Sequence, residues 1–157
     1  MPRRPRGPQA RLAALLRAAA DARKRAYAPY SRFQVGAAVL AGGRIFAAGN
    51  LENSSYPLSV CAERNAVAMA VAAGERHIEA AAIVAGDARP APPCGGCRQV
   101  LAEFAGPEAP VVYASTNGRS VTTNVAALLP DSFSPGDLSR SPVSGKGKRR
   151  SRGGIPV

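Results

Sequence analysis

Three cysteines are the residues whose types and spacing most directly indicate chemistry in this chain of 157 residues. Cys94 and Cys97 lie in the sequence PCGGC, and Cys61 lies upstream in VCAERNA. The C-x-x-C spacing is typical of a metal site, but a closed structural zinc needs four protein ligands and only three thiols are present. Three protein ligands and one open position are the arrangement of a catalytic zinc, in which water is the fourth ligand.

Glu63, two residues after Cys61, is the residue best placed to move protons at such a site. Both cysteine segments are predicted to begin helices, and helix N-termini stabilise thiolates. An acid in the first turn of a helix also simply complements the helix dipole, and this alternative stays open at this point. A Cys or His two residues before a Glu, followed by P-C-x-x-C, is nevertheless the signature of zinc nucleobase deaminases, in which the Glu is an acid/base and not a ligand.

The elements that must position these residues alternate between helices and strands. We expect helices over residues 9–27, 60–73, 94–104 and 124–129, and strands over residues 33–40, 44–48, 78–85, 110–114 and 120–123. Residues 41–43 and 116–119 have the composition of hairpin turns. The order α-β-β-α-β-α-β-β-α predicts an α/β fold with a mixed sheet and helices on its faces.

The positive charge of the chain is concentrated at its ends. The net charge is +11, of which residues 1–25 contribute +7 and residues 138–157 contribute +6, whereas residues 26–137 carry −2. We therefore predict a basic flexible leader over residues 1–9, a folded domain over 10–138 and a basic disordered tail over 139–157. The slightly acidic body does not favour nucleic acid as a partner.

The cysteine count also bears on the compartment. Three cysteines cannot all pair, and two have a metal-type spacing, so we expect a reducing compartment, the cytoplasm. No apolar run approaches the ~20 residues that a membrane span requires, so we expect no membrane association. The arginine-rich start also resembles an organelle transit peptide, and that alternative stays open.

Five stretches carry a resemblance to a known family: YSRFQVGAAV, NLENSSYP, CAERNAV, PCGGCRQVL and LLPDSFSP. In this order they resemble the small homotetrameric cytidine deaminases, from the first helix to about Leu138. The resemblance implies a three-layer α/β/α cytidine deaminase-like fold with a mixed five-stranded sheet. It also implies one Zn²⁺ per subunit, bound by Cys61, Cys94 and Cys97, and the hydrolytic deamination of cytidine and 2′-deoxycytidine to uridine and 2′-deoxyuridine in pyrimidine salvage.

The resemblance further implies roles for individual residues. Glu63 would move protons between water, the ring nitrogen N3 and the leaving amine. Arg64 would hydrogen-bond the thiolates, with Gln99 in the same polar shell. Tyr56 and Phe133 would complete the pocket of a neighbouring subunit in a homotetramer with shared sites. The full set of expected substrate contacts is Phe33, Asn50, Glu52, Tyr56, Ala62, Pro93 and Phe133.

Three alternatives remain at the level of the sequence. The first is a superfamily enzyme with another substrate, such as a blasticidin S deaminase, which shares the zinc motifs but does not need NLENSSYP and LLPDSFSP. The second is a structural-zinc module that binds nucleic acid and uses His77 as a fourth ligand. The third is a deaminase of polynucleotides that grips phosphates with the tail KGKRRSR, although such a tail is more commonly a solvated extension.

Overall fold

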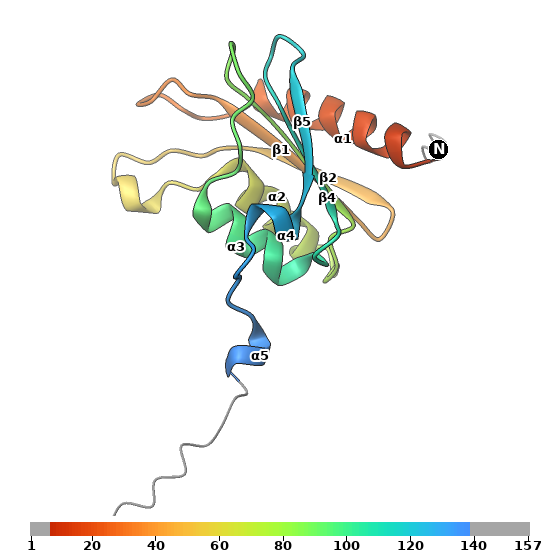
Figure 1. The fold of residues 1–157 in the computed structure, drawn as a ribbon. Helices are drawn as coiled ribbons and strands as arrows, with labels where there is room; N and C mark the ends of the chain where they lie inside the picture. The colour runs from red at the N-terminus through yellow and green to blue at the C-terminus, as the bar shows by residue number, and fades with distance from the viewer. Residues whose placement is uncertain (1–6, 139–157) are drawn as a thin grey trace, which may run out of the picture.

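The computed structural model describes residues 7–138, and the predictions made for residues 1–6 and 139–157 lie outside this range. Within residues 7–138 there are five strands, five helices and one 3₁₀ turn, arranged as Figure 1 shows. Their bounds are α1 Pro8–Arg23, β1 Val35–Ala41, β2 Arg44–Gly49, the 3₁₀ turn Tyr56–Leu58, α2 Ala62–Ala72, β3 Ala80–Ala85, α3 Gly95–Phe104, β4 Pro110–Ala114, β5 Ser120–Asn124, α4 Val125–Leu128 and α5 Pro135–Leu138.

The strands form one mixed sheet in the order β2-β1-β3-β4-β5. Only β3 and β4 are parallel, and the other neighbours are antiparallel. Helix α1 covers one face, and α2 and α3 cover the other (Figure 1). This arrangement confirms the predicted α/β fold with a mixed five-stranded sheet.

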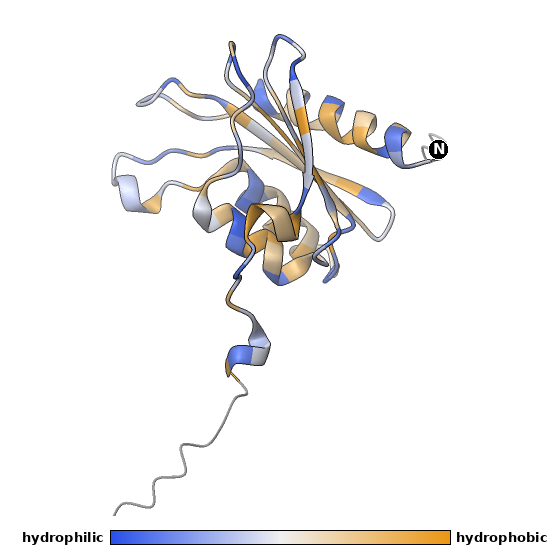
Figure 2. Cartoon of the chain, in the orientation of Figure 1, coloured by the Kyte–Doolittle hydropathy of each residue, from blue (hydrophilic) through white to orange (hydrophobic). Residues whose placement is uncertain are grey.

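Two alanine-rich cores lie on the two faces of the sheet, because alternate strand residues point in opposite directions. Figure 2 shows apolar residues along the strands and on the helix faces that meet them. On the α1 side, Leu15 and Ala19 pack against Ala38 and Ala82. Gly36 is required in β1 because a Cβ there would overlap the backbone of α1 at Ala19 and Arg23. Small residues therefore let the helix lie close to the sheet.

The topology brings the N-termini of α2 and α3 to one edge of the sheet. Helix α3 connects the parallel strands β3 and β4, so its N-terminus follows the carboxyl end of β3. Helix α2 directly precedes β3 in the chain, so its C-terminus lies toward the start of β3. Its N-terminus therefore lies toward the carboxyl end of β3, at the same edge as the start of α3. In open α/β sheets, ligands usually bind at the carboxyl ends of the strands.

No helix within residues 7–138 is long and apolar enough to span a bilayer.

The structure departs most from the expected elements at the end of α1 and at α5. Helix α1 ends at Arg23 rather than at residue 27, because Tyr27 pairs with Leu51 and its backbone bonds to Asn50 and Glu52. The short helix α5 was not expected, although its sequence carries a capping signal: both the N–H and the hydroxyl of Ser134 donate to the Asp137 carboxylate at 2.8 Å.

Candidate active site

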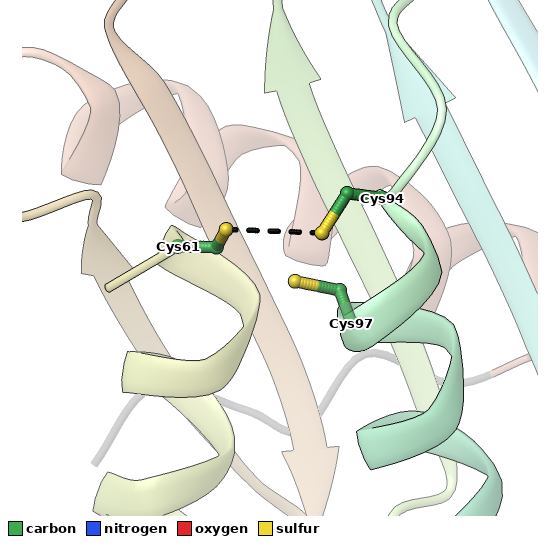
Figure 3. A group of neighbouring side chains, drawn as sticks. All are labelled: Cys61, Cys94 and Cys97. Atoms are coloured by element: carbon green, nitrogen blue, oxygen red, sulfur yellow. Dashed lines mark hydrogen bonds between the residues drawn. The ribbon is translucent and has the colours of Figure 1, made fainter. Parts of the chain in front are cut away.

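The three cysteines converge between the starts of α2 and α3 (Figure 3). Cys61 is the N-cap of α2, Cys94 is the N-cap of α3, and Cys97 lies in the first turn of α3. The Sγ atoms of Cys61 and Cys94 are 3.9 Å apart, and all three sulfurs lie within 4.8 Å of one another. Residues that are 33 positions apart in the sequence thus form one cluster.

This cluster fits a zinc ion. Tetrahedral coordination with Zn–S bonds of about 2.3 Å places the sulfurs of two ligands about 3.8 Å apart, close to the observed separation of Cys61 and Cys94. His77 is exposed and follows the opposite end of α2, whose 11 residues span roughly 16 Å. His77 therefore cannot complete the cluster, and the structural-zinc alternative loses its fourth ligand.

The environment of the cluster favours a thiolate at Cys61. The pKa of Cys61 is lowered to about 5, first by its hydrogen bond with Cys97 and also by Arg64. The pKa of Cys97 is raised, because its proton is held by the Cys61 thiolate and because the side chain is buried. Three sulfurs this close together, one of them readily ionised, are a donor set suited to a divalent cation.

Arg64 supplies positive charge beside these thiols. Its Nη2 lies 3.8 Å from the Sγ of Cys61 and donates to the carbonyl of Ser59 at 3.2 Å. Its Nε is buried and has no hydrogen-bond partner among residues 7–138. Arg64 therefore contacts Cys61 through Nη2 and keeps one buried donor unused, as expected for a group that drains charge from metal ligands.

Glu63 is the only charged residue that is buried within residues 7–138, with 6% of its surface exposed. Burial raises the pKa of its carboxyl above the usual range, and the nearby Cys61 thiolate adds to this shift. A carboxyl with a raised pKa can both accept and return a proton near neutral pH. The position of Glu63 in the first turn of α2 places this group next to Cys61.

The segment that carries Asn50 and Glu52 is fixed beside Cys61 by backbone pairing. Leu51, which lies between them, exchanges two backbone hydrogen bonds with Val60, the residue before Cys61. The Asn50 side chain accepts from the N–H of Val35 at 2.9 Å and donates to the carbonyl of Phe33 at 3.1 Å. These bonds leave one N–H and one lone pair of the amide available.

Glu52 is held by the turn after Tyr27. Its carboxylate accepts from the backbone N–H groups of Tyr30 and Ser31 and from the Ser31 hydroxyl. The Ser31 hydroxyl is the main reason that the pKa of Glu52 is lowered. Glu52 thus presents a charged acceptor to a hollow of about 340 Å³, lined by Tyr30, Ser31, Glu52, Tyr56 and Ser59.

Phe33 and Pro93 flank the segment that leads into the PCGGC turn. Phe33 is 47% exposed and lines a hollow of about 520 Å³ with residues 86–92, which lead into the turn. Pro93 is buried, and its carbonyl accepts a hydrogen bond from Nε of Arg98 at 2.9 Å. Ala62, the first residue of α2, is fully buried. Because Ala62 directly follows Cys61 in the chain, its backbone lies beside the thiol cluster.

The remaining two predicted contacts, Tyr56 and Phe133, are large aromatic side chains that are mostly exposed. Tyr56 is 70% exposed, and its ring centroid lies 6.0 Å from that of Tyr30. Phe133 is 58% exposed and lies on the segment between α4 and α5. The two segments project from different sides of the body (Figure 1). A single chain does not enclose both residues in one pocket.

Sequence reasoning missed Ser31 and Arg98. Ser31 holds Glu52 from 21 residues away, and Arg98 bonds the carbonyls of Pro93 and Leu128. The only signal for Arg98 was its place directly after Cys97. Gln99, expected near the thiolates, donates from Nε2 to the carbonyl of Phe133 at 2.8 Å. Its role in the polar shell of the thiolates remains a prediction.

Comparisons with known proteins agree with this geometry. The family model described as the cytidine and deoxycytidylate deaminase zinc-binding region matches residues 10–114. The cytidine deaminase of Sporosarcina psychrophila is 50% identical over 119 residues, which cover 75% of this chain and 88% of that protein. The cytidine deaminase of Halalkalibacterium halodurans is 44% identical over 126 residues, covering 80% of this chain and 96% of that protein. The crystal structure of cytidine deaminase from Burkholderia pseudomallei superposes with a TM-score of 0.74 at 46% identity, covering 77% of this chain and 98% of that one.

We predict that the purified protein contains about one zinc per chain and that Cys61→Ser, Cys94→Ser or Cys97→Ser loses it, because two thiols cannot hold the ion against a chelator. Metal analysis after dialysis against a weak chelator measures this. His77→Ala is the matched control and should retain the zinc. A cysteine variant that retains a full equivalent would contradict the ligand assignment.

Proposed function

This chain belongs to the cytidine deaminase family, and we propose that it catalyses the zinc-dependent hydrolytic deamination of cytidine and 2′-deoxycytidine, which yields uridine and 2′-deoxyuridine with release of ammonia. The observation that carries this proposal is the cluster of three thiols at two helix N-termini with the buried carboxyl of Glu63 beside it. We infer that residues 10–138 form the catalytic domain. Its free thiols suit the reducing cytoplasm.

Cys61, Cys94 and Cys97 would hold the zinc. When bound, zinc supplies a Lewis acid that makes water a nucleophile near neutral pH. The three thiolates alone would oppose this effect with their negative charge, so the guanidinium of Arg64 beside Cys61 offsets part of it.

Glu63 moves the protons of the reaction. It accepts a proton from the attacking water and delivers it to ring nitrogen N3. It then takes the second proton from the hydroxyl now on C4 and passes it to the amine, so that the C4–N bond breaks, C4=O forms, and water and cytidine become uridine and ammonia. Its burial and raised pKa support both directions of transfer. Positioned proton transfer of this kind is typically worth roughly 10²–10⁴-fold in rate.

The substrate contacts follow from the groups arranged around the cluster. The remaining lone pair of Glu52 and the remaining N–H and lone pair of Asn50 suit the hydroxyls of a ribose. The exposed ring of Phe33 offers a face to the base. The backbone of Ala62 would contact the pyrimidine, and the Pro93 carbonyl would face the departing ammonia.

The active sites are shared between subunits of a homotetramer. Tyr56 and Phe133 support this part of the proposal, because exposed large aromatics on projecting segments usually mark an interface. Each of these side chains would project from its own subunit and cover the substrate pocket of a neighbouring subunit.

We expect Glu63→Gln to keep the fold and the zinc yet to lose turnover of cytidine by roughly 10²–10⁴-fold, because an amide cannot shuttle protons. Loss of absorbance at the cytidine maximum measures the rate, with blasticidin S as a comparison substrate. Glu103→Gln on the exposed side of α3 is the matched control and should behave like the parent. A Glu63→Gln enzyme with a near-normal rate would rule out the acid/base role of Glu63. Faster turnover of blasticidin S than of cytidine by the parent protein would favour blasticidin S as the substrate.

Subunit mixing tests the shared site. Glu63→Gln and Phe133→Ala chains should each be weak alone, because one lacks the acid/base and the other lacks the aromatic that it donates. After co-refolding, some sites combine Glu63 of one chain with Phe133 of another, so activity should exceed the sum of the separate variants. Tyr56→Ala should give the same recovery with Glu63→Gln. Sedimentation of the parent as an active monomer would argue against sharing.

A further inference from the structure

Two consecutive side chains of α3, Arg98 and Gln99, bind the segment that follows α4. Nη1 of Arg98 donates to the carbonyl of Leu128, the last residue of α4, at 3.0 Å. Nε2 of Gln99 donates to the carbonyl of Phe133 at 2.8 Å. The turn that carries Cys94 and Cys97 is thus connected to both ends of residues 128–133.

Arg98 also reaches back to the metal-binding turn. Its Nε donates to the carbonyl of Pro93 at 2.9 Å while Nη1 holds Leu128. The planar guanidinium fixes the geometry of these two bonds relative to each other. The start of the segment therefore has a fixed position relative to the cysteine turn.

The ring of Phe133 is held in another way. With 58% of the residue exposed, packing within its own chain does little to fix the ring. The Gln99 bond fixes the backbone from which the ring projects, five residues beyond the end of α4. Removing this donor leaves the exposed segment free to sample other orientations.

We propose that Gln99 is a positioning residue that acts on the active site of a neighbouring subunit, by holding the backbone of Phe133, while Arg98 anchors the start of the same segment. This inference rests on the shared site proposed above. It assigns Gln99 to the neighbour's pocket rather than to the thiolates of its own subunit. The defect of a Gln99 variant should therefore appear in substrate binding at the adjacent site.

The first experiment compares Gln99→Met, which keeps the size but removes the donor, with Gln99→Lys, which keeps a donor. We expect Gln99→Met to raise the KM for cytidine about fivefold, the effect of one lost hydrogen bond, with kcat and zinc content close to the parent. Gln99→Lys should restore most of the KM. Gln99→Glu cannot donate and gives a second variant should Gln99→Met fold poorly. A parent-like KM in both donor-free variants would overturn the proposal.

The second experiment locates the effect. Gln99→Met chains are co-refolded with an excess of Glu63→Gln chains. Every site that retains Glu63 then lies on a Gln99→Met chain and receives Phe133 from a Glu63→Gln chain, in which Gln99 is unchanged. We expect the KM to return to the parent value. A KM that stays raised would show that Gln99 acts within its own subunit and would overturn the proposal.

The pair of Glu63→Gln and Phe133→Ala separates the two possible failures. If this pair recovers no activity, the shared site itself is wrong. If it recovers activity while Gln99→Met keeps its raised KM in the excess mixture, only the positioning role of Gln99 is wrong. Size-exclusion chromatography of each mixture confirms that the compared assemblies have the same size.

Discussion

Three sulfur atoms lie within 4.8 Å of one another, and as thiolates they repel. Two unit charges 4 Å apart near a protein surface repel by about 4 kcal/mol, whereas a helix N-terminus stabilises an anion by about 0.3–2 kcal/mol. Two helix ends and the guanidinium of Arg64 therefore cannot keep three thiolates together without a bound cation. A divalent ion bound between the three sulfurs offsets this repulsion, and because the chain supplies only three thiols, one coordination position stays open.

The fold is arranged to satisfy this constraint. The parallel pair β3 and β4, connected by α3, places the start of α3 at the carboxyl edge of the sheet, and α2 begins at the same edge. Alanines in the core between α2, α3 and the sheet allow these helices to lie close to the strands. On the other face, Gly36 lets α1 approach the sheet in the same way. The Leu51–Val60 pairing then brings Asn50 and Glu52 to the same place.

The sequence predicted the features that depend on short spacing. Cys61 and Glu63, the C-x-x-C turn and the periodicities of the strands are local, so the metal ligands and the class of fold could be inferred from them. Contacts between distant residues could not. Tyr27 continues the predicted helix in its local pattern, but its pairing with Leu51 ends α1 early. The hydrogen bonds of Ser31 to Glu52, Arg98 to Leu128 and Gln99 to Phe133 join residues 21 to 34 positions apart, and no local signal announces them.

Zinc K-edge X-ray absorption of the zinc-loaded protein tests the central claim most directly, because it counts the ligands of the ion without relying on activity. The account predicts three sulfur ligands at about 2.3 Å and one oxygen or nitrogen ligand at about 2.0–2.2 Å, with no imidazole contribution. Four sulfur ligands would show a closed site shared between chains, and an imidazole signal would bring His77 back as a ligand. Either result would contradict a three-thiolate centre with one open position.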